Sequence, residues 1–169
     1  MSIIKSLNEL KHFNFKLSDL GEVYSFNKMI EYVINNTKSE LYECDLDYSC
    51  RDNFGTYSVG YRVFLKHKPS NKTLYIYFGY IFNYIKQSGI FAEVDYDSNK
   101  DFFEEVCKNV DSLPNYTINR IESPFLKLFY PEDDYEKLIK EKSYEAQVIK
   151  LKEFFNACCN SFIKGLKTI

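Results

Sequence analysis

The sequence has little alanine, glycine, proline and arginine, which together account for only 16 of its 169 residues. The three arginines, Arg51, Arg62 and Arg120, offer few of the planar guanidinium contacts that grip phosphate groups, and the lysines are interspersed with carboxylates. The six glycines form no GxGxxG or GxxxxGK[ST] motif. These absences argue against nucleic-acid binding and against the usual nucleotide-binding loops.

Long hydrophobic runs are also missing. No segment approaches the roughly 18 to 20 apolar residues that a membrane-spanning helix needs. The first thirteen residues mix Lys5, Glu9 and Lys11 with apolar side chains, a pattern unlike that of a signal peptide. We therefore expect no membrane association and a cytoplasmic location.

The cysteines provide no disulfide or zinc framework. Their number is odd, and Cys44, Cys50, Cys107, Cys158 and Cys159 show no CxxC spacing. A chain of this length can bury roughly 70% of the surface that its unfolded form exposes, so its stability requires no metal. We expect one globular domain over residues 1–169, reduced thiols and no cofactor.

Five residue types dominate what is present. Lys, Asn, Ile, Phe and Tyr supply 77 residues, which is typical of AT-rich coding DNA and predicts an origin in a low-GC bacterium or a mobile element. The formal net charge is only −2. The distribution of aromatic and acidic side chains along the chain is therefore more informative than their totals.

Residues 41–97 follow a period of two, which predicts strands at about 41–50, 57–68, 73–82 and 90–97. In the first hairpin we expect Asp47 opposite Arg62 and Glu43 opposite Lys66, because that register also places Leu46 opposite Val63. A turn at 69–72 leads into the third strand and predicts the two pairs Leu65 with Ile76 and Val63 with Phe78.

Helical periodicity flanks this region. We predict a short helical piece at 3–13, a helix from Asp19 to about Asn36 and a short helix after Ser98 and Asp101, which would cap it. Residues 116–130 are ambiguous between two short strands and irregular structure. Pro131 suits the first position of a further helix.

The clearest amphipathic helix begins near Ser143. Its apolar positions recur at spacings of three and four; they are Tyr144, Val148, Leu151, Phe155, Cys158, Phe162 and Leu166. The prediction is an α+β fold: an antiparallel meander of four or more strands packed on N-terminal and C-terminal helices.

Three arrangements could carry chemistry. Glu43, Asp45 and Asp47 share one strand face and could bind Mg²⁺ or Ca²⁺ in a phosphodiester hydrolase, or they could be neutralised by Arg62 and Lys66. A second triplet at 93–97 is expected with two strands between it and the first, roughly 14 Å away, too far to share one ion. We predict no metal site.

The other two arrangements involve thiols. Cys44 and His67 are expected to lie diagonally on one sheet face, and Cys158 and Cys159 are neighbours in the last helix, with Cys158 facing the core and Cys159 its flank. Nucleophilic catalysis would require an exposed, activated thiolate. We interpret these residues as packing groups and predict no catalytic residue.

The remaining candidate is the outer face of the sheet, where aromatic side chains stand among acids. Unless a helix at 131–142 or the N-terminal piece covers it, this face has the composition of a surface that binds a basic protein. The predicted partner-binding residues are Glu43, Asp45, Asp47, Phe64, Tyr75, Tyr77, Phe91, Glu93 and Asp95.

The functional hypothesis is a small, non-enzymatic protein-binding domain. It would act as an inhibitor, immunity or anti-defence protein that blocks a basic partner such as a nuclease. Two alternatives stay open: the metal-dependent hydrolase described above, and a chaperone-like adaptor that dimerises through the sheet or the last helix.

Overall fold

A computed structural model describes residues 17–47, 58–84, 87–110 and 116–166. The predicted helical piece at 3–13 and Cys50 lie outside these residues. None of the helices in the described ranges has both the length and the apolar character needed to cross a membrane.

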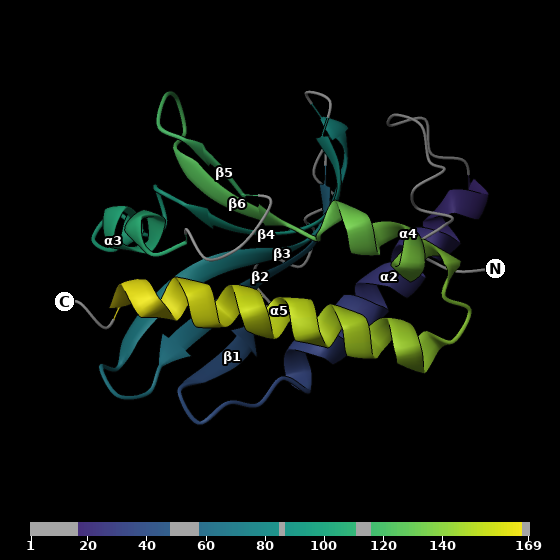
Figure 1. Cartoon of the computed structure of the whole chain (residues 1–169), viewed down its shortest axis with the longest axis horizontal. Coiled ribbons are helices and arrows are strands. Elements are labelled where there is room, and N and C mark those ends of the chain that lie inside the picture. Colours follow the sequence, from purple (N-terminus) through teal and green to yellow (C-terminus); the bar gives the residue numbers. More distant parts are fainter. Residues whose placement is uncertain (1–16, 48–57, 85–86, 111–115, 167–169) are drawn as a thin grey trace.

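The fold is α+β, as predicted, with six antiparallel strands in one sheet. The strands are β1 (Tyr42–Leu46), β2 (Ser58–His67), β3 (Lys72–Tyr84), β4 (Gln87–Asp95), β5 (Tyr116–Asn119) and β6 (Phe125–Phe129). Their order across the sheet is β1-β2-β3-β4-β6-β5, so the meander continues through the first four strands and ends in a β5–β6 hairpin (Figure 1). The ambiguous segment 116–130 is therefore two strands.

The register of the first hairpin agrees with the prediction. Glu43 pairs with Lys66 and Leu46 with Val63, and the Asp47 amide donates to the Arg62 carbonyl at 2.9 Å. Apolar matching on one face and opposite charges on the other select the same alignment.

The predicted register of the second hairpin is wrong by two residues. Leu65 pairs with Leu74, and Val63 pairs with Ile76, because β3 begins at Lys72 and the turn lies one residue earlier than expected. Asn71 ends this turn with φ 56°, a left-handed conformation that asparagine tolerates better than most residues. A shift of two residues leaves every side chain on its predicted face, since strand side chains alternate with period two.

The helices differ from the predictions mainly at their ends. They are α2 (Leu17–Asn35), α3 (Phe103–Lys108), α4 (Glu132–Lys140) and α5 (Tyr144–Leu166). No side chain caps α3, whose N-cap is Phe102. The predicted cap by Ser98 and Asp101 is therefore wrong. Pro131 occupies the N-cap of α4, one position earlier than expected.

One face of the sheet, the core face, packs against the helices. Helix α2 contacts β1, β2 and β3, while α5 contacts β2, α2 and α3; Figure 1 shows α5 running lengthwise across the sheet. Phe155 of α5 meets Phe78 of β3 with ring centroids 4.6 Å apart. Of the predicted apolar positions of α5, only Tyr144 remains exposed.

Helix α4 also belongs to the core side. Its Leu138 is buried, and the Tyr135 hydroxyl lies 3.5 Å from that of Tyr80, a core-face residue of β3. Helix α4 therefore does not cover the opposite face, which we call the outer face. No helix in the described residues packs on that face.

Helix α3 packs so closely on α5 that Gly165 should not tolerate a larger side chain. A Cβ at Gly165 would lie 2.6 Å from the Val106 Cα, so we expect Gly165→Ala to lower the free energy of unfolding by roughly 1–3 kcal/mol through overpacking. At Gly21 in α2, a Cβ would meet nothing within 4 Å. Gly21→Ala should instead stabilise by about 0.5–1 kcal/mol. Urea unfolding of both variants measures these changes, and an equal response at the two positions would contradict this packing.

Candidate partner-binding face

The outer face combines side chains from β1, β2, β3, β4 and β6. Alternation along each strand directs Asp45, Phe64, Tyr75 and Tyr77 to the side opposite the helices, and β4 adds Phe91 beside Tyr77. All nine predicted partner-binding residues lie in the described ranges. They fall into two groups that differ in exposure.

The first group is partly exposed and lies over β1, β2 and β3. Phe64 and Tyr75 pair across the strands in an edge-to-face contact with ring centroids 5.2 Å apart. The Arg62 guanidinium lies 4.8 Å from the centre of the Tyr75 ring and donates to the Ser98 Oγ at 3.0 Å. These contacts hold two aromatic rings in place at the surface, which reduces the entropy that they would lose on binding a partner.

The second group is largely inaccessible. Phe91 is only 2% exposed, and its ring lies between those of Tyr77 and Phe129 at centroid distances of 5.5 and 6.3 Å. Burial raises the pKa of Tyr77, an effect that the Ser58 hydroxyl partly offsets. Phe91 therefore supports the face from within, and Tyr77 is only partly exposed, with its hydroxyl oxygen buried.

Lys127 is a residue of the outer face that sequence analysis did not identify. Its side chain is 9% exposed and pairs with Glu93 at 2.8 Å. Its Nζ atom lies 4.8 Å from the Phe91 ring centre and 4.6 Å from that of Phe125. The alternation of Phe125, Lys127 and Phe129 is visible in the sequence. It indicates a place for Lys127 on the outer face only when β6 is known to pair with β4.

Most acids of the face are already neutralised or hydrogen-bonded. Asp47 is nearly buried, with one carboxylate oxygen 3.9 Å from the Arg62 Nε. Glu43 approaches Lys68 at 3.9 Å, although Lys66 is its partner in the strand register. The triplet of β1 therefore does not act as three equivalent charges.

Asp95 has a structural role at the end of β4. Its Oδ1 accepts the Ser98 amide at 2.7 Å, and its carbonyl accepts the Asn99 Nδ2 at 2.9 Å. Asn99 also bonds the backbone amide and carbonyl of Tyr75 at 2.8 Å each, which ties this turn to β3. Asp45 differs because it is exposed and has no ion-pair partner within the described residues.

Because the Glu93–Lys127 ion pair is largely buried, removing one of its two charges should lower the free energy of unfolding. In Glu93→Gln the enclosed ammonium loses its carboxylate, so we expect a loss of roughly 2 kcal/mol in the free energy of unfolding. Lys127→Met keeps the apolar stem and leaves Glu93 within reach of water, and should cost about 1 kcal/mol or less. The double variant should be more stable than Glu93→Gln alone. Urea titration of the three variants tests this order, and equal losses for both single variants would contradict it.

The metal hypothesis finds no support in the geometry. Among the described residues, no three His, Cys, Asp or Glu side chains lie close enough together to hold a metal ion. Glu43, Asp45 and Asp47 all belong to this part of the chain. They do not converge into the ligand set that a Mg²⁺-dependent hydrolase would need.

The thiols lie on the core side. Cys44 and His67 sit diagonally, as predicted, but the side chain of Cys44 contacts Cys159 in α5. His67 is buried and shares a hydrogen bond of 2.7 Å between its Nδ1 and the Ser70 Oγ. Cys159 is as buried as Cys158, so the expectation that it lies at the flank of the helix is wrong. Burial raises the pKa of both thiols, the opposite of nucleophile activation.

Thiol burial also predicts a stability loss at alkaline pH. Burial raises the pKa of Cys107 from 9.0 to about 11, so the folded state holds this proton more tightly than the unfolded chain. The associated stability is complete below pH 9 and is lost as the pH rises towards 11. Urea unfolding at intervals from pH 8 to 11 should show a smaller decline for Cys107→Ala than for the unsubstituted protein. Identical slopes would contradict the assignment.

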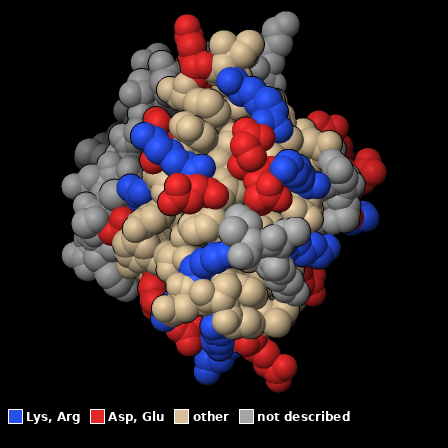
Figure 2. Space-filling view, turned by 90° about the vertical axis from the view of Figure 1, so that its left-hand side faces the viewer, with Lys and Arg blue, Asp and Glu red and all other residues tan. Residues whose placement is uncertain are grey.

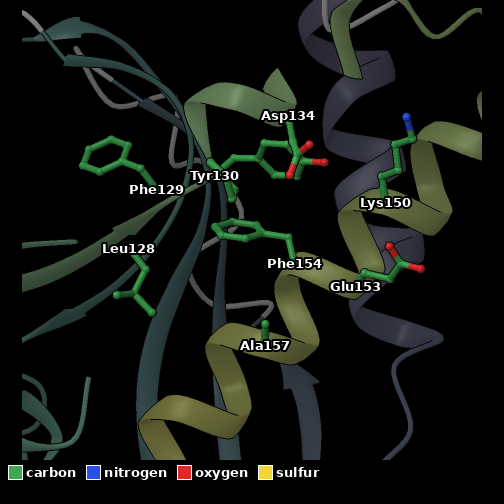
Figure 3. Close-up of a pocket in the computed structure, with 9 residues that line it drawn as sticks. Leu128, Phe129, Tyr130, Asp134, Lys150, Glu153, Phe154 and Ala157 are labelled. Carbon is green, nitrogen blue, oxygen red and sulfur yellow. The ribbon is translucent and has the colours of Figure 1, made fainter. Parts of the chain in front are cut away.

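A hollow of about 200 Å³ lies where β6 ends and α4 begins, facing α5. Leu128, Phe129, Tyr130 and Phe154 contribute its apolar surface. Figure 3 shows the Asp134 side chain beside the Tyr130 ring, with Lys150 and Glu153 on α5. Sequence analysis missed this hollow because it joins segments about twenty residues apart, through the packing of α5.

Charges of both signs alternate at one end of the molecule. Figure 2 shows lysine and arginine side chains intermixed with aspartate and glutamate over the end that carries α3. Arg120 of the β5–β6 hairpin pairs with Glu104 of α3, and Lys108 pairs with Glu105. The described residues at this end form neither the basic stripe of a nucleic-acid interface nor a continuous acidic patch.

No family model, curated protein or solved structure matches this chain. The α+β architecture and the geometry of its surfaces are thus the basis for a functional proposal.

Proposed function

We propose that this chain is a non-enzymatic protein-binding domain that holds a partner with a basic surface against the exposed part of its outer sheet face. The proposed binding patch consists of Glu43, Asp45, Phe64 and Tyr75, with Asp95 at its border. An inhibitor or immunity protein that occludes a basic enzyme, such as a nuclease, is the form of this function that we favour.

The observation that carries the proposal is the contrast between Asp45 and its neighbours. Asp47 and Glu93 are paired with cations of the chain itself, whereas Asp45 is exposed and lacks an ion-pair partner within the described residues. It lies opposite Phe64, whose ring is fixed against Tyr75. A free carboxylate beside ordered, half-exposed aromatic rings is a composition suited to a basic protein surface.

The inner part of the face supports this role by rigidity. Lys127, Glu93 and Phe91 form a largely buried cluster across β4 and β6, so the part of the sheet next to the patch is held by cross-strand side-chain contacts. A surface that is ordered before binding loses less conformational entropy when a partner docks.

The test is partner capture with charge reversal. The tagged protein captures its partner from the cells that encode it, and affinity is then measured with both purified proteins. Asp45→Lys should weaken binding at least about tenfold, because a free carboxylate that faces a basic surface becomes a repulsive charge. Tyr75→Ala should weaken it by a similar factor, since an aromatic anchor is removed.

Two controls separate binding from folding. Glu136→Lys makes the same charge change on an exposed site of α4, away from the patch, and should leave the affinity unchanged. Asp95 is tested as Asp95→Asn, because an amide oxygen can still accept the Ser98 amide. If Asp45→Lys and Tyr75→Ala both bind the partner as tightly as the unsubstituted protein does, the proposed patch is wrong.

A further inference from the structure

The hollow at the end of β6 has walls that suit a long aliphatic stem. Tyr130 and Phe154 meet edge to face with ring centroids 5.2 Å apart. Both side chains are only half-buried, and the partly exposed Ala157 adds to the apolar surface beside them, whereas Leu128 is buried behind it. Aromatic faces open to solvent attract methylene groups by burial and cations through their ring quadrupoles.

The rim of the hollow carries two carboxylates. Asp134 comes from the first turn of α4 and Glu153 from α5, and both are exposed (Figure 3). Asp134 has Lys137 as a surface partner at 2.8 Å, whereas Glu153 has no ion-pair partner within the described part of the chain. Burial raises the pKa of the Tyr130 phenol to about 12, and the negative charges of Asp134 and Glu153 add to this effect. The space beside Tyr130 therefore favours positive charge.

Lys150 supplies the one cation that lines the hollow among the described residues. It lies three residues before Glu153 on α5, yet no ion pair within 4 Å joins them. Lys150 thus repels a second cation at the rim without neutralising the carboxylate. Removal of the Lys150 charge should therefore strengthen the binding of a cation in the hollow.

Phe129 of β6 contributes both to the hollow and to the packing of the outer face. Phe129 lines the hollow, and its ring also lies 6.3 Å from that of Phe91, beneath the outer face. Only a partner wide enough to cover the sheet from the patch to the end of β6 would meet both the patch and the hollow.

We propose that this hollow binds the side chain of a lysine or arginine that projects from the basic partner. The stem lies against Phe154 and Ala157, and the cationic group lies over Tyr130 between the carboxylates of Asp134 and Glu153. This inference rests on the proposed function, since it assigns an anchoring residue to the same basic partner.

The test uses a small probe, so that it does not require the partner. N-acetyl-argininamide, whose only charge is its guanidinium group, is titrated into the ¹⁵N-labelled protein, with N-acetyl-leucinamide and N-acetyl-glutamate amide as matched probes. We expect saturable chemical-shift changes at the residues of the hollow with the arginine probe alone. The double variant Asp134→Asn/Glu153→Gln should raise its dissociation constant at least about fivefold.

Lys150→Met provides the sharpest control. It removes a like charge from the rim and should lower the dissociation constant of the arginine probe about two- to threefold. Glu136→Gln, on the exposed surface of α4, changes the net charge by the same amount as either rim substitution and should have no effect. Unchanged amide spectra away from each substitution show that the variants are folded.

The outcomes separate this inference from the proposed function. No saturable change with the arginine probe, preference for the glutamate probe, or weaker binding in Lys150→Met would overturn the cation-binding hollow. Each of these results leaves the outer face to be judged by the effect of Asp45→Lys on partner capture. Conversely, if the arginine probe binds in the hollow while Asp45→Lys leaves the affinity for the partner unchanged, that result would support the hollow and contradict the outer-face patch.

Discussion

The packing of α5 on the core face is the interaction on which the rest of the structure depends. Phe155 fits against Phe78 in the middle of the sheet, and further along the helix Gly165 lets α3 approach. The neighbouring Phe154 also reaches Phe78, but extends to Tyr130 at the start of α4. One helix thus connects the sheet, α2, α3 and the segment that follows β6, because its apolar stripe is wide enough to contact all of them.

The outer face is divided into an enclosed part and an exposed part. Towards β6, Lys127 and Glu93 form an ion pair among aromatic rings. These two charges therefore link β4 to β6. Towards β1, Asp45 stays exposed beside Phe64. Since a desolvated charge pair is costly to disrupt and an exposed charge is cheap to reorient, we place the proposed partner on the second region.

Local rules predicted much of this fold. Alternation and charge matching gave the pairing of Glu43 with Lys66 and Leu46 with Val63, and helical spacing gave the buried positions of α5. The errors arose where the outcome depends on one residue of turn geometry, as at Asn71, or on whether a side-chain cap forms at all, as before α3. Local sequence also left 116–130 undecided, because strands of four and five residues gain their stability from pairing with each other and with β4.

The sequence by itself determined the class of fold, the faces of the first four strands and the helix that covers them, because periodicity is a property of neighbouring residues. It also placed the nine candidate residues on the outer face. Only the tertiary structure decided which of them are accessible: Phe91 is enclosed by Lys127 and Phe129 from β6, and Asp47 is held by Arg62, whereas Asp45 remains exposed. The hollow beside Tyr130 likewise exists only once α5 has packed. Burial and pairing depend on segments distant in the chain, and no local pattern encodes which of those segments will meet.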